Sequence, residues 1–188
     1  MNEQQKKTLL KVAKDTVAAA VSGKAVYEPT SDDPMLLAEV GCFVTLKNGP
    51  QLRGCIGQFT ADKPLIEMVC QMAVSSSVYD PRFGGNRITT GELPDLDIEI
   101  SVLSAMEKTD DPLSLRLGVD GIYITDGRVS GCFLPQVAGE TGWNKEDFLG
   151  FCCAHKAGLA PDAWKTDPNV EVYLFTADVF GAEWNDIQ

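Results

Sequence analysis

The sequence predicts an α+β fold with a mostly antiparallel sheet and flanking helices. Helical periodicity occurs near both ends of the chain, over Glu3–Ser22 and Lys145–Ala157. Between them lie short strand-like runs joined by the hairpin signals Asn48-Gly49 and Asp126-Gly127. Strands that follow one another through short turns are typical of antiparallel sheets, whereas parallel sheets need long crossover connections.

Apolar spacing and end signals define the helices. In the first, apolar residues recur at helical spacing up to Gly23. A second helix is expected after Asp62, which can cap it, with Pro64 in its first turn. This helix is apolar nearly all round, which indicates burial. Further helices are expected at Thr90–Leu93, at Leu113–Leu117 and at Lys145–Ala157, the last capped by Asn144 and Asp147 and ended by Gly158.

Strands are expected where residues alternate or where β-branched side chains cluster. These runs are Glu39–Leu46, Gln51–Phe59, Asp97–Leu103, Gly121–Thr125, Arg128–Leu134 and Val170–Phe180. Within Asp97–Leu103, the alternation directs Glu99 and Ser101 to a solvent-exposed face.

The register of the first hairpin has two solutions. A two-residue turn at Asn48-Gly49 would pair Val44 with Arg53 and Cys42 with Cys55. Pro50, however, cannot donate the hydrogen bond that closes such a turn. A longer or bulged connection therefore remains equally open.

Composition favours a cytoplasmic globular protein. The 188 residues fit one domain, and the net charge of −11 disfavours binding to nucleic acid, whose affinity comes mainly from phosphate neutralisation. The longest nearly apolar stretch, Pro64 to Val78, is too short to span a bilayer. The first residues lead into a lysine-bearing helix that lacks the uninterrupted apolar core of a signal peptide.

The six cysteines do not define a disulfide framework or a metal site. No pair has Cys-x-x-Cys spacing, and a disulfide framework is not expected in a cytosolic chain of this size. Cys152, Cys153 and His155 are close in sequence, but on a helix Cys153 points about 100° away from the other two. We therefore assign no metal and no cofactor.

The hexapeptide Leu52-Arg53-Gly54-Cys55-Ile56-Gly57 is the most site-like stretch. With a period of two, Arg53, Cys55 and Gly57 share one strand face. A cation on the same face as a thiol favours the thiolate, and glycines in strands often mark the close approach of a ligand or another backbone. The alternative is a small buried cysteine between glycines that serve only packing.

Several motifs together resemble the AMMECR domain family, whose bacterial and archaeal members are called AmmeMemoRadiSam system protein A. They are LRGCIG (52–57), DPRF (80–83), LDIEISVL (96–103), GVDGIYI (118–124), FLPQV (133–137) and HKAGL (155–159). The resemblance runs from about residue 5 to residue 182, and implies that residues 1–188 form one such domain with a larger and a smaller lobe.

The resemblance implies a groove near LRGCIG, an association with Memo-type and radical S-adenosylmethionine proteins, and no defined reaction. The motif positions carried over are Arg53, Gly54, Cys55, Gly57, Asp80, Pro81, Arg82, Pro135 and Gln136. From these, the ligand-binding candidates are Arg53, Gly54, Gly57, Asp80, Arg82 and Gln136, and the catalytic candidate is Cys55.

Each candidate also has a structural interpretation. The two guanidinium groups could bind an anion bidentately, or each could pair with a nearby acid such as Asp80. Gln136 could contact a ligand or cap backbone groups at a bend between the lobes. His155 could be a base or a partly packed residue at a helix C-terminus. The function is therefore either that of an enzyme component using Cys55 on an unknown small molecule, or that of a non-catalytic binding module for a protein partner.

Overall fold

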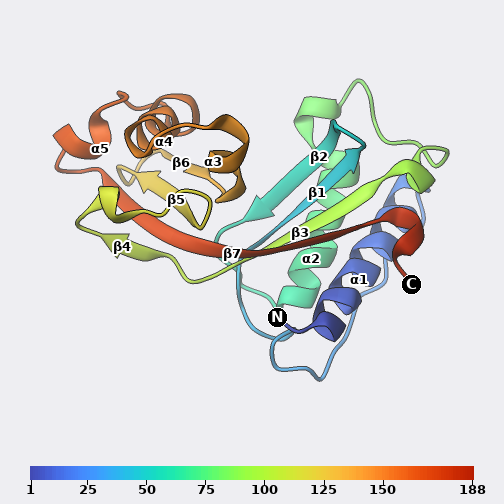
Figure 1. Cartoon of the computed structure of the whole chain (residues 1–188). Helices are drawn as coiled ribbons and strands as arrows, with labels where there is room; N and C mark the ends of the chain where they lie inside the picture. Colours follow the sequence, from blue (N-terminus) through green and yellow to red (C-terminus); the bar gives the residue numbers. More distant parts are fainter. The chain divides into compact units, whose positions relative to one another are not determined.

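The computed structural model describes all 188 residues and divides the chain into two compact units. Unit 1 comprises Met1–Leu103 and Asp178–Gln188, and unit 2 comprises Ser104–Ala177. The strand β7 (Glu171–Glu183) supplies its first part to unit 2 and its second part to unit 1. Both units combine strands with helices, which confirms the predicted α+β class with flanking helices and an antiparallel sheet (Figure 1).

Unit 1 contains a sheet with the strand order β2-β1-β3, and β7 lies next to β3. The strands are β1 (Cys42–Asn48), β2 (Gln51–Gln58) and β3 (Asp97–Leu103), and β1 is antiparallel to both neighbours. The face that carries Val44, Leu46 and Ile100 belongs to the main hydrophobic core. β2 is therefore an edge strand whose outer backbone groups need partners from elsewhere.

The helices α1 (Glu3–Val21) and α2 (Leu65–Val74) cover that core face of the sheet (Figure 1). Both were predicted, and α2 is buried as expected. Its cap was predicted wrongly: Pro64, not Asp62, occupies the N-cap position, and no side chain caps the helix. The carbonyl groups of Ala38 and Leu36 accept the first free N–H groups of α2, so a side-chain cap is unnecessary.

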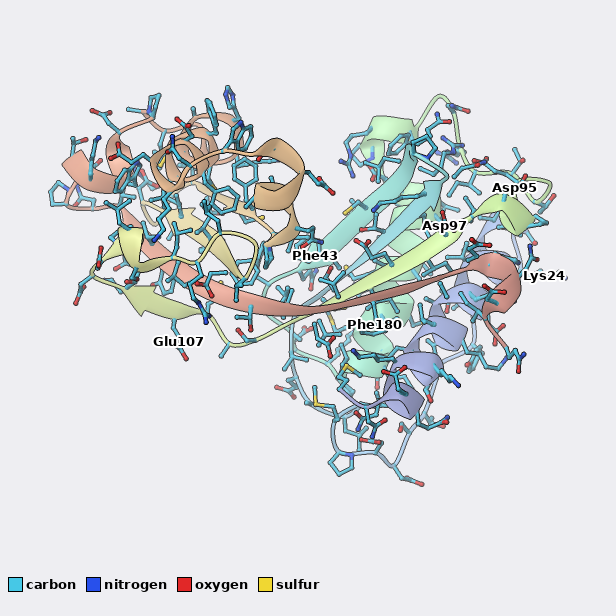
Figure 2. The ribbon with its side chains drawn as sticks, viewed as in Figure 1. Lys24, Phe43, Asp95, Asp97, Glu107 and Phe180 are labelled. Atoms are coloured by element: carbon cyan, nitrogen blue, oxygen red, sulfur yellow. The ribbon has the colours of Figure 1, made fainter.

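The serine run after α2 continues the helix as a π-helical turn, Ser75–Tyr79. A 3₁₀ turn follows at Pro81–Phe83 and another at Leu93–Asp95, where the sequence predicted a helix at Thr90–Leu93. A last 3₁₀ turn spans Trp184–Asp186. Side chains occupy the space between α1 and β7, where Lys6 Nζ lies 5.4 Å from the centroid of the Phe180 ring (Figure 2).

In unit 2, β4 and β5 pair with opposite edges of the first part of β7, and β6 pairs with β5. These strands are β4 (Glu107–Thr109), β5 (Asp120–Thr125) and β6 (Ser130–Phe133). The hairpin predicted at Asp126-Gly127 is confirmed, with Thr125 opposite Ser130. β4 was not predicted, because three residues are too few to show a period.

The helices of unit 2 pack Phe148 and Leu149 against Ile122 and Ile124 of the sheet. They are α3 (Gln136–Thr141), α4 (Lys145–Cys152) and α5 (Ala163–Thr166), with a 3₁₀ turn at Pro112–Ser114. α4 continues as a π-helical turn to Ala157 and ends at Gly158, so the predicted helix and both of its end signals are confirmed. None of the helices in either unit has the length and apolar character needed to cross a membrane.

Candidate functional site

A β-bulge at Arg53 shapes the candidate site. Asn48 pairs with Gln51 and Lys47 with Leu52, but Leu46 pairs with Gly54, so Arg53 has no partner on β1. The turn therefore consists of Gly49 and Pro50, and Gly49 adopts a φ of +54° that suits glycine.

This register decides between the two predicted hairpins. Cys55 lies opposite Thr45, and Cys42 lies opposite Gln58. The predicted Cys42–Cys55 pairing is thus wrong, and the bulged connection is confirmed. The turn lies at Gly49-Pro50 instead of Asn48-Gly49, which shifts the register of β2 against β1, and the bulge at Arg53 shifts it by one further residue. All six cysteines are free thiols.

Arg53 is buried and its charge is neutralised by Glu92. Its side chain is 4% exposed and pairs with the Glu92 carboxylate through Nε and Nη2. Nη2 also donates to the Asn86 carbonyl at 3.2 Å, whereas the buried Nη1 has no hydrogen-bond partner. The hydrogen bond with Glu92 raises the pKa of Arg53 and lowers that of Glu92. Arg53 therefore bonds to residues of the loop that follows DPRF. It does not bond to Cys55 Sγ, which accepts a hydrogen bond from Thr45.

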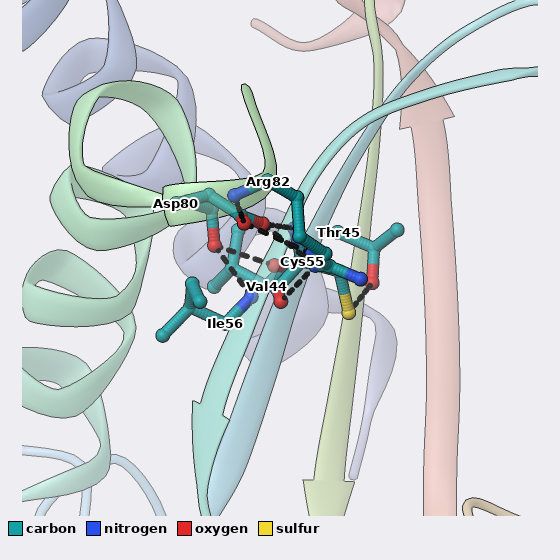
Figure 3. A network of polar contacts seen from close by, with 7 residues as sticks. Val44, Thr45, Cys55, Ile56, Asp80 and Arg82 are labelled. Atoms are coloured by element: carbon teal, nitrogen blue, oxygen red, sulfur yellow. Dashed lines mark hydrogen bonds and ion pairs between the residues drawn. The ribbon is translucent and has the colours of Figure 1, made fainter. Parts of the chain in front are cut away.

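Asp80 and Arg82 hold the outer edge of β2, and we call this pair the Asp80–Arg82 clamp (Figure 3). Asp80 Oδ2 accepts the Cys55 N–H at 3.0 Å, and Arg82 Nη2 donates to the Cys55 carbonyl at 2.8 Å. The two side chains also pair with each other, with Nε–Oδ1 at 2.9 Å and Nη2–Oδ2 at 2.6 Å. Both edge-facing backbone groups of Cys55 are thus satisfied by side chains of DPRF.

The same carboxylate fixes its own turn. Asp80 precedes the 3₁₀ turn at Pro81–Phe83 and accepts the Arg82 N–H at 3.1 Å. Burial alone would raise the pKa of Asp80, but the hydrogen bonds from Arg82 and Cys55 outweigh it, so the pKa lies below its ordinary value. Asp80 is therefore an ionised, buried anchor between two sequence motifs.

The glycines of LRGCIG are explained by close packing. A Cβ at Gly54 would lie 2.0 Å from the Ser76 carbonyl oxygen, and one at Gly57 would lie 2.2 Å from the Phe43 ring. Ser76 approaches because its hydroxyl donates to the Val44 carbonyl at 2.7 Å and accepts the Ile56 N–H at 3.0 Å. The π-helical turn thus bridges β1 and β2, as Figure 3 shows for Val44 and Ile56.

Cys55 lies on the sheet face opposite the main core, in a row of polar side chains. Thr45, opposite Cys55, is also opposite Glu99 on β3. The Thr45 hydroxyl donates to Cys55 Sγ at 3.2 Å, and Glu99 pairs with Lys47 at 3.3 Å. The next residue on that face of β3, Ser101, is 1% exposed, so the predicted exposure of Ser101 is wrong.

Accessibility separates Cys55 from most other thiols. Cys42, Cys70, Cys152 and Cys153 are buried, whereas Cys55 and Cys132 are partly exposed. Burial raises the pKa of Cys42 to about 12, which makes it unreactive at neutral pH. Cys55 is therefore the accessible thiol of unit 1.

The remaining candidates lie in unit 2. Gln136 is the first residue of α3, not part of a bend between lobes. His155 is exposed and stacks on Phe151 at 5.6 Å between centroids. Cys152 and Cys153 are buried, and no group of three His, Cys, Asp or Glu side chains is arranged to hold a metal ion.

Three contributors were missed by the sequence interpretation. Ser76 was treated only as part of a helix-weakening serine run, and Thr45 was not singled out, although a hairpin places its hydroxyl across from a cysteine. Glu92 lies in a loop 39 residues from Arg53, and no local pattern marks it as the partner. Of the predicted residues, the structure brings together Arg53, Gly54, Cys55, Gly57, Asp80 and Arg82 in unit 1.

Together, the fold and the site define a class of α+β protein in which LRGCIG forms an edge strand clamped by DPRF. The chain belongs to the AMMECR1 family, whose model matches residues 10–180.

Its relatives include archaeal proteins with no stated activity. Protein TK0174 of Thermococcus kodakarensis is 41% identical over 187 residues, covering 94% of this chain and 89% of the relative. Protein MK0488 of Methanopyrus kandleri is 41% identical over 172 residues, covering 86% and 80%. The crystal structure of the uncharacterized protein PH0010 from Pyrococcus horikoshii is similar, with a TM-score of 0.87 and 36% identity, and the match covers 97% of this chain and 94% of that one. The similarity establishes family and fold, and leaves the reaction open.

Proposed function

We propose that this AMMECR1-family protein is a binding component of a modification or metabolic pathway and acts with Memo-type and radical S-adenosylmethionine proteins. Its ligand surface is the region around Leu52–Gly57. The single observation that carries the proposal is the Asp80–Arg82 clamp, which holds the backbone of Cys55 in place. A binding site requires that the groups contacting the ligand are held in place by neighbouring residues, and the clamp does this for the backbone of Cys55.

The groups that remain accessible fit a ligand with an anionic end. The Arg82 side chain is 53% exposed, so part of its guanidinium can still donate to a carboxylate or phosphate. Tyr79, 71% exposed, offers an aromatic ring one residue before the clamp. The partly exposed Cys55 Sγ adds a polar group on the sheet face, where the buried Thr45 hydroxyl donates to it.

Binding is favoured over covalent catalysis because the charges near Cys55 are already neutralised. Arg53 pairs with Glu92, Arg82 pairs with Asp80, and the thiol accepts from Thr45. A nucleophilic cysteine is activated by an adjacent base or a free cation, and the one cation that contacts Cys55, the Arg82 guanidinium, is already paired with Asp80. The partial exposure of Cys55 nevertheless supports a second candidate, thiol chemistry by an enzyme component.

Alkylation of the native protein distinguishes the two. If Cys55 only binds, iodoacetamide should modify it no faster than Cys132, the other partly exposed cysteine, as measured by peptide mass spectrometry over time. Cys42 and Cys152 are internal controls that should react only in urea. Modification of Cys55 more than about tenfold faster than Cys132 would contradict the binding interpretation and favour the enzyme.

The pathway is tested by metabolite profiling of a deletion strain beside strains carrying Cys55→Ser or Arg82→Gln. We expect the deletion and Arg82→Gln to change the same metabolites, and Cys55→Ser to leave them unchanged. A profile altered by Cys55→Ser but not by Arg82→Gln would contradict anion binding at this surface.

A further inference from the structure

Unit 2 contains a groove whose lining residues, apart from His155, lie outside the sequence motifs described above. It lies between α4 with its π-helical extension and the segment 161–165, and has a cavity volume of about 370 Å³. That volume lies at the lower end of the range of small-molecule pockets, about 300–1,000 Å³. All residues that line the groove belong to unit 2, whereas LRGCIG belongs to unit 1.

The lining of the groove is aromatic with an acidic rim. Phe151 carries the stacked His155 ring on one wall, with an interplanar angle of 27°, and Trp164 stands on the other. The charged side chains at the rim are three carboxylates, Glu146, Asp147 and Asp162, and one lysine, Lys165. Aromatic faces and carboxylates both attract cations, so the chemistry of the groove favours a positively charged occupant.

The chain itself shows how a cation is held here. Lys165 Nζ lies 5.3 Å from the centroid of the Trp164 ring and 3.6 Å from Glu146 Oε2. Both side chains of this ion pair are about half exposed or more, at 49% and 64%, so the pair is weak and can exchange. Lys165 therefore occupies a cation site between the Trp164 ring and the Glu146 carboxylate. A cation that binds both groups more tightly than Lys165 can displace it.

We propose that this groove binds an arginine side chain from an extended basic segment of a partner protein. The guanidinium stacks on Trp164, pairs with Glu146 and displaces Lys165. Arginine fits better than lysine because its planar guanidinium stacks on an indole and pairs bidentately with a carboxylate. The net charge of −11 adds long-range attraction for a basic segment.

The test uses a capped peptide with two arginines separated by glycine, and the same peptide with citrulline, which keeps the shape and removes the charge. Binding to the full-length chain is measured by isothermal titration calorimetry. We expect the citrulline peptide to bind about tenfold more weakly, and Trp164→Leu and Glu146→Gln each to weaken arginine binding about fivefold.

The decisive variant is Lys165→Gln, which removes the internal competitor and should tighten arginine binding about threefold or more. Glu67→Gln on α2, exposed and remote in sequence, is the matched charge control and should have no effect. Because Lys165→Gln predicts a gain, a folding defect cannot imitate it. Unchanged or weaker binding by Lys165→Gln, or an equal gain in the exposed control Lys24→Gln, which removes the same charge, would overturn the displacement of Lys165. Equal loss in Glu67→Gln and Glu146→Gln would overturn the proposal in favour of unspecific attraction to an acidic surface.

Discussion

The two arginine–carboxylate pairs around LRGCIG are built in opposite ways. In the Arg53–Glu92 pair the cation is the buried member, 4% exposed against 19% for the carboxylate. In the Asp80–Arg82 clamp the carboxylate is buried at 1%, and the cation is 53% exposed. A buried charge is costly without its partner, whereas an exposed charge is solvated by water. The effect of removing one residue should therefore depend on which charge remains behind, and on how many hydrogen bonds still satisfy that charge. Asp80 keeps two backbone N–H groups without Arg82, whereas Arg53 keeps only the Asn86 carbonyl without Glu92.

The largest effect is expected for Glu92→Ala, because it leaves the buried Arg53 guanidinium without its anion. Loss of one partner of a buried pair lowers the free energy of unfolding by about 3–5 kcal/mol. Urea denaturation followed by circular dichroism measures it, with Glu67→Ala as the exposed control expected within about 0.5 kcal/mol. A loss below about 1 kcal/mol would mean that water solvates the Arg53 guanidinium when Glu92 is absent, and would contradict the description of Arg53 as a buried charge.

A smaller and pH-dependent effect is expected for Asp80→Asn. The substitution leaves Arg82 in solvent but weakens the bonds to the Cys55 and Arg82 N–H groups, which should cost about 2 kcal/mol at pH 7. The folded-state pKa of Asp80 is below its ordinary value of 3.8, so the ionised carboxylate stabilises the fold above that pH. This contribution is lost as the pH falls through the folded-state pKa.

The difference between wild type and Asp80→Asn should therefore be constant from pH 7 to about pH 5 and shrink towards pH 2, as urea midpoints across that range can measure. A difference that grows on acidification would contradict the assignment of Asp80 as an ionised anchor.

The smallest effect is expected for Arg82→Ala. Asp80 remains buried, but it keeps the hydrogen bonds from the Cys55 and residue 82 N–H groups, and the lost ion pair is half exposed. We expect the free energy of unfolding, measured by urea denaturation, to fall by about 1 kcal/mol or less. If Arg82→Ala lowers the free energy of unfolding as much as Glu92→Ala does, the Asp80–Arg82 clamp and the Arg53–Glu92 pair do not differ in the way proposed.

Local signals predicted most of the fold. Asn144, Asp147 and Gly158 define α4 and its extension because caps act within one turn, and Asp97–Leu103 was predicted to the residue because its alternation is regular. Asp62 failed as a cap because carbonyl groups from residues 36 and 38, distant in sequence, already satisfy the start of α2.

The site was predicted only in part, since its residues are near in space but not in sequence. The motifs placed Cys55, Asp80 and Arg82 among the candidates, and the pairing of Asp80 with Arg82 was one of the stated alternatives. A bulged connection was one of the two stated alternatives, but its position at Arg53 was not predicted, because the strand faces were assigned from an unbroken alternation that the bulge interrupts. The bond from Asp80 to the backbone of β2 depends on a π-helical turn, for which the serine run gives no signal.

The covered edge of β2 also bears on how this protein behaves in a crowded cell. An uncovered edge strand offers N–H and C=O groups to which a strand of another molecule can add, and such additions lead to aggregation. The side chains of Asp80 and Arg82 occupy both of these groups at Cys55, in the middle of the strand. A variant without the clamp could thus remain folded and still be lost to self-association, so its solubility would report on DPRF more sensitively than its stability.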